Sequence, residues 1–244
     1  MPQTFIPTLH YLSHSGAFRC LWALEELKEA KGIEYKLKTY ERKMGQAPPS
    51  LAEVFPMGKS PIITLETTDP KVALPTIQLV PGVITEGMLI LRYLNEEFGE
   101  GMWTPASEDK HRNEFFQVFA NNSLMSQLSL ILLPESIIAV CPMGISALLG
   151  LLLSPLTSMF KARLQPAFKL LDDELEHKPW FAGAKFGVAD IDMSFSMDIA
   201  SERGYINFEK YPRLRDWHKS INSRPSYSRA LKLCNGYNMK TFGV

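Results

Sequence analysis

Two short stretches of the sequence carry residues suited to binding a small polar molecule. In the first, Lys59 and Ser60 precede Pro61 at the start of a strand-like run. A strand can begin with proline because its missing N–H need not join the ladder. If the bond before Pro61 is cis, the chain turns sharply and Ser60 exposes its backbone N–H and C=O. Cis bonds are uncommon even before proline, so this stretch alone is equally typical of an ordinary strand start.

The second stretch is a polar pair at the start of an apolar, helix-like run. Thr85 and Glu86 precede Gly87, and methionine, leucine and isoleucine follow. The free N–H groups at a helix N-terminus, together with the positive end of the helix dipole, favour a carboxylate. Taken alone, Glu86 also fits a simpler role in compensating the helix dipole. The run nevertheless predicts a place where a ligand carboxylate could bind.

Charge and cysteine content exclude several classes of function. The 26 basic side chains balance 26 acidic ones, so no net charge draws the chain toward nucleic acid. Cys20, Cys141 and Cys234 match no metal-ligand spacing, and Cys20 has no CxxC partner. An odd number of scattered cysteines favours a reducing compartment, and the N-terminus is a poor signal or transit peptide. We therefore expect a cytoplasmic protein that binds neither a metal nor nucleic acid.

The residues of the two ligand-binding stretches must be positioned by secondary structure. In the first part of the chain, strand-like and helix-like stretches alternate. A strand–helix–strand unit, in which Gly32 ends the helix, normally brings its two strands parallel. A second pair of strands and an amphipathic helix follow it. The predicted elements are strand 8–12, helix 18–31, strand 34–40, a short helical or irregular piece over 47–55, strand 61–65, an antiparallel strand within 72–84, and helix 85–98.

Beyond about residue 103 the pattern is helical, and no strand-like alternation recurs convincingly. We therefore expect an N-terminal domain over residues 6–102 and an all-helical domain over residues 103–244. The predicted helices of the second domain cover residues 112–133, 143–153, 157–176, 189–203 and 214–223.

The two ligand-binding stretches together resemble the glutathione-site signature of the glutathione transferase family. Within the family, residues 18–27 and the uncharged insert after Pro134 look closest to a fungal and bacterial branch. The resemblance implies an α/β thioredoxin-like N-terminal domain, an all-α C-terminal domain and glutathione as co-substrate. Ser60, before a cis Pro61, would pair its backbone with the cysteinyl part of glutathione, and Lys59 would meet the glycyl carboxylate. Glu86 and Gly87 would hold the γ-glutamyl carboxylate. Gly87 departs from the usual serine and lacks its hydroxyl donor.

The resemblance also implies a catalytic hydroxyl in the loop after the first strand. Its role would be to lower the pKa of the glutathione thiol, because the thiolate is the nucleophile and a free thiol has a pKa of about 8.5. Ser15 lies four residues before Arg19, the spacing of serine-type members, and is also a natural cap for the first helix. Tyr11 fits the position of tyrosine-type members, and Ser13 is a third alternative. We favour Ser15.

The activity that the resemblance implies is conjugation of glutathione to a hydrophobic electrophile, as in detoxification, by a homodimer. The electrophile would lie in an apolar cleft between the two domains. Two alternatives remain open: a non-catalytic protein that binds glutathione or hydrophobic ligands, and a glutathione-dependent peroxidase. The helical half also resembles the family at Gly187 and Asp190, which predict a capping box. The expected pocket residues of the helical half are Phe119, Asn122, Ser123 and Ser126.

Residues 136–160 contain no charged side chain. A helix needs about 20 consecutive, mainly apolar residues to span a membrane. Because Pro142, Gly144, Gly150 and Pro155 interrupt the run, we expect buried helices, a dimer face or the wall of an apolar pocket rather than a membrane span. Peripheral contact with a membrane stays open.

Overall fold

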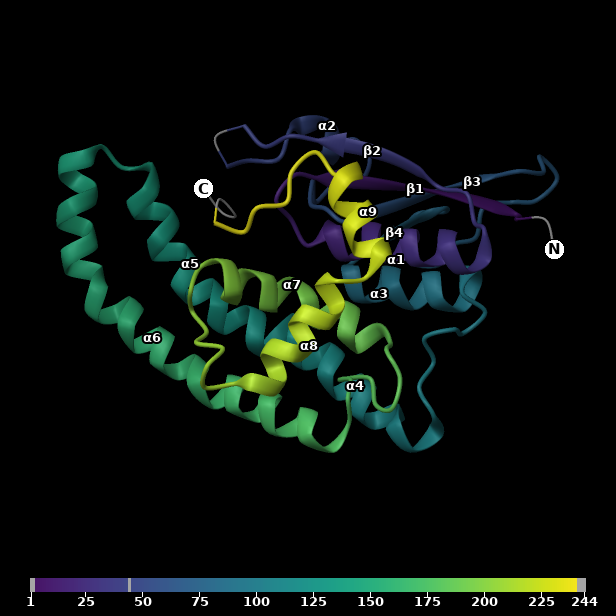
Figure 1. Cartoon of the computed structure of the whole chain (residues 1–244). Coiled ribbons are helices and arrows are strands. Elements are labelled where there is room, and N and C mark those ends of the chain that lie inside the picture. The colour runs from purple at the N-terminus through teal and green to yellow at the C-terminus, as the bar shows by residue number, and fades with distance from the viewer. Residues whose placement is uncertain (1–2, 44, 241–244) are drawn as a thin grey trace. The chain divides into compact units, whose positions relative to one another are not determined.

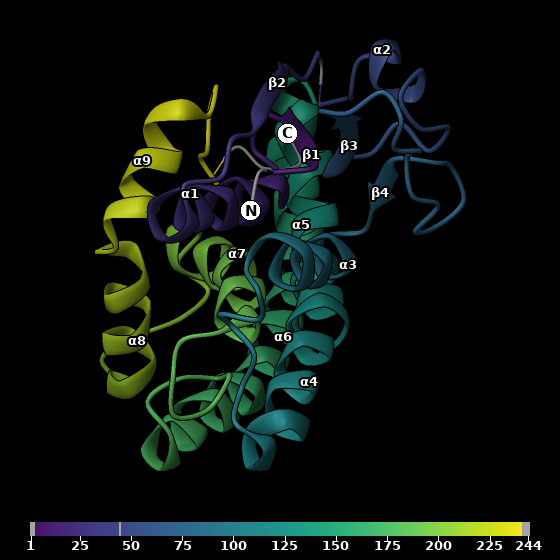
Figure 2. The same cartoon turned by 90° about the vertical axis from the view of Figure 1, so that its right-hand side faces the viewer.

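The computed structural model describes residues 3–43 and 45–240, and the chain divides into two compact units. The first unit comprises the chain up to Thr104 together with Asn222–Tyr237 (Figures 1 and 2). The second comprises Pro105–Ile221 and the residues after Tyr237. A single division near residue 103 therefore misses one feature, because a C-terminal segment returns to the first unit.

A four-stranded mixed sheet forms the centre of the first unit, in the order β2-β1-β3-β4. β1 (Phe5–Leu12) runs parallel to β2 (Lys36–Tyr40), because helix α1 (Ala17–Lys31) connects them as a crossover. β3 (Ile62–Thr67) runs antiparallel to both β1 and β4 (Val83–Thr85). The strand–helix–strand unit followed by two strands and a helix confirms the predicted thioredoxin-like arrangement.

Helices cover the sheet from both sides. α1 packs against β1 and against α3 (Gly87–Tyr93), which continues through the π-helical turn η1 (Leu94–Phe98). Figure 1 shows α1 and α3 side by side below the strands. The four-residue helix α2 (Pro49–Ala52) contributes Leu51 to a smaller apolar cluster. The other buried members of this cluster are Leu12, Tyr40 and Ile62.

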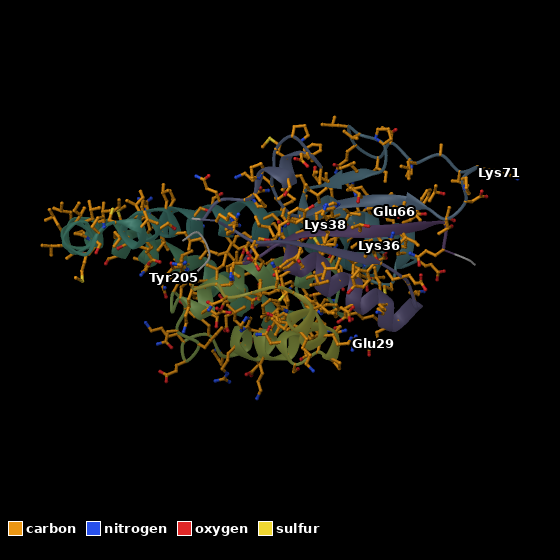
Figure 3. The ribbon with its side chains drawn as sticks, turned by 90° about the horizontal axis from the view of Figure 1, so that it is seen from above. Glu29, Lys36, Lys38, Glu66, Lys71 and Tyr205 are labelled. Carbon is orange, nitrogen blue, oxygen red and sulfur yellow. The ribbon has the colours of Figure 1, made fainter. Side chains whose placement is uncertain are left out.

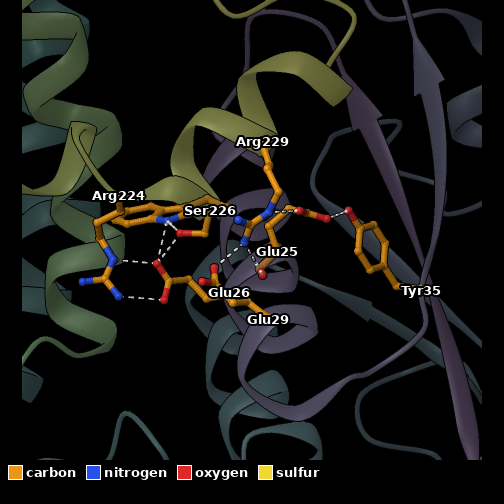
Figure 4. Close-up of polar contacts among 8 residues, drawn as sticks. Glu25, Glu26, Glu29, Tyr35, Arg224, Ser226 and Arg229 are labelled. Atoms are coloured by element: carbon orange, nitrogen blue, oxygen red, sulfur yellow. Dashed lines mark hydrogen bonds and ion pairs between the residues drawn. The ribbon is translucent and has the colours of Figure 1, made fainter.

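The C-terminal helix α9 (Pro225–Leu233) is held on α1 by buried ionic contacts (Figure 4). Arg224 donates two hydrogen bonds to the Glu26 carboxylate, at 2.6 and 2.8 Å. Ser226 donates a third to Glu26, and the Trp22 indole N–H donates at 3.2 Å. Burial raises the pKa of Glu26, but these donors together bring it below its ordinary value. Next to this group, Arg229 binds Glu25 and Glu29 (Figure 4).

Replacing this carboxylate should loosen α9. We expect Glu26→Gln to lower the free energy of unfolding by about 1–3 kcal/mol, because buried donors then lose their ionised acceptor. Urea unfolding at pH 7 measures the effect. The wild-type contribution is fully present above pH 4.5 and is lost as the pH falls through the lowered pKa. Glu29→Gln is the matched control, since the Glu29 carboxylate is 55% exposed; equal losses in both variants would contradict the assignment.

The second unit is helical among the residues described. α4, η3 and α5 follow one another without a break, so a single helical path runs from Lys110 to Val140. α7 is buried along most of its length and packs against α4 and α5. The bounds are η2 Ser107–Asp109, α4 Lys110–Val118, η3 Phe119–Leu124, α5 Met125–Val140, α6 Met143–His177, α7 Val188–Glu202 and α8 Pro212–Asn222.

Two predicted helix ends were wrong. The expected end at residue 133 is absent, since α5 passes through Pro134, and the two helices expected over 143–153 and 157–176 are the single helix α6. Pro155 has no N–H to donate to the carbonyl of Leu151, one turn earlier. The Ser154 hydroxyl donates to that carbonyl at 3.1 Å, which compensates for the missing bond. The helix therefore continues where proline predicted a break.

The capping box predicted at the start of α7 is present and extends into a larger network. The Gly187 N–H donates to the Asp190 carboxylate at 3.1 Å. The same carboxylate accepts from the N–H groups of Phe181 and Ala182, at 2.9 and 3.3 Å, and from the Trp217 indole at 2.8 Å. Asp190 is fully buried. Burial raises its pKa to about 6, although the four N–H donors favour the ionised form.

Candidate functional site

A pocket of about 420 Å³ opens in the first unit, next to the ends of β1 and β2. Its size is in the range of pockets that bind small molecules. Lys59 and Ser60, which the sequence analysis selected, both line it, and so does Arg42. The remaining wall is mainly backbone and small or apolar side chains, from Leu12, Gly45, Gln46, Ala47, Pro48, Pro49, Ala52, Met57 and Gly58.

Ser60 is one of the residues that line this pocket. The Ser60–Pro61 bond, which the residues alone left open and the family resemblance implied to be cis, is cis. The Ser60 hydroxyl is already used, because it donates to the His10 carbonyl at 2.8 Å and accepts from the Leu12 N–H at 3.1 Å. Across residues 3–43 and 45–240, neither the N–H nor the C=O of Ser60 has a hydrogen-bond partner. A ligand backbone could therefore pair with both groups, as one more strand pairs with a sheet edge.

Arg42 was not selected from the sequence, although it is the second cation of the pocket. Its Nε donates to the Ser13 carbonyl at 3.2 Å, and its Nη1 donates to the Gly45 carbonyl at 3.0 Å. These bonds hold a positive charge near Lys59, which is exposed. The sequence did contain a signal for Arg42, because it follows the second strand of the predicted strand–helix–strand unit. Parallel strands end at the same edge of a sheet, so a residue just after β2 must lie near the end of β1.

The strand register brings the second predicted stretch beside the first. Ile62 pairs with Thr85, so Glu86 follows β4 next to the point where Pro61 precedes β3. Glu86 has a φ of 65°, which is rare for a residue other than glycine and is often found at functional sites. Gln78 fixes the preceding residue, accepting from the Thr85 N–H at 2.9 Å and donating to its carbonyl at 3.0 Å.

Gly87 differs from the serine expected at this position for a steric reason. A Cβ atom at residue 87 would lie 2.6 Å from Nη2 of Arg19. A serine therefore requires the guanidinium group to move. Gly87 begins α3 and is buried, so its backbone N–H remains at the helix N-terminus while Arg19 occupies the space of the missing side chain.

Two of the three candidate hydroxyls already donate to protein carbonyls. Ser15 donates to the Leu12 carbonyl at 2.6 Å and accepts from the Ala17 N–H at 3.3 Å, so it closes the first turn of α1. Tyr11 donates to the Gly236 carbonyl at 2.9 Å. Burial, with a smaller contribution from Cys234, raises the pKa of Tyr11 far above its ordinary value.

The third hydroxyl, that of Ser13, has a different role. Its Oγ accepts from the Arg42 N–H at 3.3 Å, and the Ser13 N–H donates to the Tyr40 carbonyl at 2.8 Å. In the part of the chain that the structure describes, the Ser13 hydroxyl proton has no acceptor. The sequence favours Ser15 as thiol donor, but the Ser15 proton is already donated and that of Ser13 is not donated to any residue described.

The C-terminal segment contacts this loop, which no pattern in the sequence indicated. The Gly236 carbonyl accepts from the His14 N–H at 3.0 Å as well as from Tyr11. The Tyr237 ring stacks on Phe18 with centroids 3.9 Å apart. Residues far apart in sequence therefore complete the surroundings of the loop within the first unit.

The four residues expected to bind an electrophile lie on one helical path of the second unit. Phe119 is half-buried and stacks on Phe115 with centroids 5.7 Å apart. Asn122, Ser123 and Ser126 are exposed. They follow Phe119 at helical spacing, so they are available to a ligand of the second unit. No cluster of three or more His, Cys, Asp or Glu side chains suited to a metal occurs among the residues described.

Two family models match this chain. The model described as "Glutathione S-transferase, N-terminal domain" matches residues 7–96, and "Glutathione S-transferase, C-terminal domain" matches residues 161–225. Together they cover more than half of the sequence. The first match contains most of β1, the pocket residues and the start of α3, and the second contains Asp190 and the residues that donate hydrogen bonds to its carboxylate.

Individual proteins agree with these models. Glutathione S-transferase 3 of Schizosaccharomyces pombe is 27% identical over 89% of this chain and 84% of its own length. Glutathione S-transferase 1 of Saccharomyces cerevisiae is 26% identical over 90% and 92%. A crystal structure of a glutathione S-transferase from Actinobacillus pleuropneumoniae superposes with a TM-score of 0.71, at 25% identity, over 97% of both chains.

Proposed function

Because this chain belongs to the cytosolic glutathione S-transferase family, we propose that its pocket binds glutathione for conjugation to hydrophobic electrophiles. Family and fold support transferase activity in general. One observation supports glutathione most directly: Ser60, whose N–H and C=O have no hydrogen-bond partner among the residues described, lines a pocket together with Lys59 and Arg42. A short peptide with a free carboxylate complements this combination.

We assign the parts of glutathione to the pocket as follows. The cysteinyl backbone pairs with Ser60, and the glycyl carboxylate lies near Lys59 and Arg42. The γ-glutamyl carboxylate binds at the start of α3, beside Glu86 and Gly87. The Ser13 hydroxyl donates to the thiolate sulfur, since the protons of Ser15 and Tyr11 are already donated. Such a donor lowers the pKa of the bound thiol.

The reaction then follows from the thiolate. The sulfur attacks the carbon of the electrophile, for example an aromatic halide, so that a C–S bond forms and the carbon–halogen bond breaks. The halide leaves with the bonding electrons, and the thiol proton goes to solvent. Holding both reactants lowers the barrier further. We propose Phe119, Asn122, Ser123 and Ser126 as the contribution of the helical unit to electrophile binding, and a cytoplasmic homodimer active in detoxification as the working form.

Glutathione binding is tested by calorimetric titration of Lys59→Met. We expect its Kd to rise about three- to tenfold, as for loss of one partly exposed, charge-assisted contact. Lys71→Met is the control, since Lys71 is exposed in a loop outside the pocket (Figure 3). A glutathione ester without the glycyl charge should bind wild type and Lys59→Met equally. An unchanged Kd for glutathione would contradict the Lys59 assignment, and absence of any binding by wild type would contradict the proposed function.

The non-catalytic alternative has one observation in its favour. Ser13, Ser15 and Tyr11 are all buried, so none presents an exposed hydroxyl in the ligand-free chain. If wild type binds glutathione but neither conjugates an aromatic halide nor reduces an organic peroxide, the chain is a binding protein of the same fold. Peroxide reduction without conjugation would indicate the peroxidase alternative.

A further inference from the structure

The second unit carries an exposed apolar arm, which we define as Ser136–Phe160. The arm contains the end of α5, the connection through Cys141 and Pro142, and the first half of α6. It has no charged residue. α6 is long and apolar enough to cross a membrane by length and composition, and none of its most apolar 18 residues is buried. The continuous helix Ser107–Val140 meets the same criterion, and 28% of its most apolar 18 residues are buried.

The arm is apolar around most of its circumference rather than along one stripe. Within the arm, α6 is half-buried on one side, which carries residues such as Leu149 and Leu153. The residues on its other sides are exposed. Met143, Leu148, Leu151 and Leu152 are 88, 58, 72 and 63% exposed, and they point in several directions around the helix. In Figure 3 carbon-rich side chains surround the outer part of the teal helices on every visible side.

The distribution of apolar side chains around the arm helps to decide what covers it, a second copy of the chain or a lipid membrane. A second copy of the chain would cover one face of the helix pair, and a soluble helix in water would carry polar residues on the other faces. An arm that is apolar on several faces is suited instead to a surrounding apolar medium.

The polar side chains within the arm point to the same medium. The hydroxyls of Ser136, Ser146, Ser154 and Thr157 donate to carbonyls of their own helix, three or four residues earlier, at 2.8–3.1 Å. Helices in lipid satisfy their polar groups in this way, because no water is available there. Four of the five hydroxyls of the arm are therefore bonded within their own helix, and the fifth, that of Ser158, is exposed.

Positive charge gathers where the arm ends. Lys161, the first charged residue after Phe160, pairs with Glu135 at 3.0 Å, and Arg203 pairs with the same carboxylate at 2.8 Å. Tyr205, labelled in Figure 3, also donates to Glu135. Arg163 is exposed beyond this group. Lys161 is 41% exposed and Arg163 is exposed as well, so two basic side chains are accessible where the arm ends, an arrangement that favours anionic lipid headgroups.

We propose that the arm inserts into the interfacial layer of a lipid bilayer and attaches this transferase reversibly to membranes rich in anionic lipid. Insertion buries Leu148, Leu151 and Leu152 among acyl chains, while Lys161 and Arg163 remain at headgroup level. The ionic group around Glu135 limits the depth, so the arm anchors the chain without spanning the membrane. This attachment is independent of glutathione binding, which belongs to the other unit.

Flotation of the full chain with vesicles tests the proposal. The vesicles are pure phosphatidylcholine, or equal parts phosphatidylcholine and phosphatidylserine. Wild type should float with both, and more strongly with the second. The double variant Leu151→Glu/Leu152→Glu should lose at least about tenfold in vesicle partition, because two charges enter the apolar layer. Both positions are exposed, so the fold is retained. Leu79→Glu, at a leucine 82% exposed in the first unit, should float like wild type.

A native cysteine reports on insertion directly. Cys141 lies between α5 and α6, and Cys20 is buried, so Cys234→Ser leaves Cys141 for labelling with a polarity-sensitive dye. Its emission should shift to the blue on adding the anionic vesicles, with no shift in the double variant. Wild type that stays in solution with both vesicles overturns the proposal. If, in addition, the double variant converts a dimer to a monomer in sedimentation, the arm is covered by a second copy.

Discussion

Ser13→Ala is expected to slow the conjugation of glutathione to an aromatic halide by about ten- to a hundredfold at saturating glutathione, the usual cost of losing one donor to a buried anion. The variant removes the one hydroxyl of the loop whose proton has no acceptor among the residues described. The pKa of bound glutathione should rise toward the ordinary thiol value, which a pH titration of thiolate absorbance measures. Ser13→Thr, which keeps a hydroxyl, should restore most of the rate.

Tyr11→Phe and Ser15→Ala are the matched variants for this experiment. Each removes a hydroxyl bound to a carbonyl of the chain, at Gly236 and Leu12, so each should affect stability more than the thiol pKa. A full rate in Ser13→Ala together with a raised thiol pKa in Ser15→Ala would return the assignment to Ser15, the residue that the sequence favours. If all three variants keep the wild-type rate, none of these hydroxyls activates the thiol.

The second large effect is on stability. Asp190→Ala should lower the free energy of unfolding by about 3–5 kcal/mol, because it leaves four buried N–H donors without an acceptor. Globular proteins are typically stable by only about 5–15 kcal/mol, so much of the native state could be lost at 37 °C. Urea unfolding followed by tryptophan fluorescence measures the change, and Trp217 itself contacts this carboxylate.

Asp216→Ala is the control for this variant. Asp216 lies on α8 next to Trp217, but its carboxylate is 66% exposed and pairs only with Arg215 among described residues. Its removal should change stability by less than about 1 kcal/mol. If Asp190→Ala unfolds at the same urea concentration as wild type, the prediction is wrong. Burying the carboxylate would then cost as much free energy as its four hydrogen bonds contribute.

The sheet was predicted well because each of its strands and connecting helices is indicated by a short stretch of sequence. Alternation marked β1 and β3, Gly32 ends α1 in a left-handed conformation, and the spacing of Gly187 and Asp190 indicated the capping box. Prolines within helices were misleading. Pro155 lies inside α6 because a neighbouring serine side chain takes over the bond that the proline cannot make. Such compensation depends on a side-chain rotamer, which the sequence does not specify.

The site was predictable where one segment supplies all its atoms. Lys59, Ser60 and Pro61 are adjacent in sequence, so their signature identified the pocket. Arg42 required knowing that β1 and β2 are parallel neighbours. Among the three hydroxyls, Ser15 donates to the carbonyl of Leu12, three residues before it, whereas Tyr11 donates to Gly236, more than 200 positions away in sequence. Long-range contacts of this kind leave no trace in the spacing of Tyr11, Ser13 and Ser15.

The return of residues 222–237 to the first unit affects how the chain must be made. During synthesis from the N-terminus, the sheet and α1 emerge first, but the segment that binds Glu26 and contacts Tyr11 emerges only after residues 105–221. The first unit can thus reach its final state only after these residues have left the ribosome. A chain that stopped before residue 236 would lack the carbonyl that binds Tyr11 and the ring that stacks on Phe18, so the loop after β1 would be left without part of its surroundings.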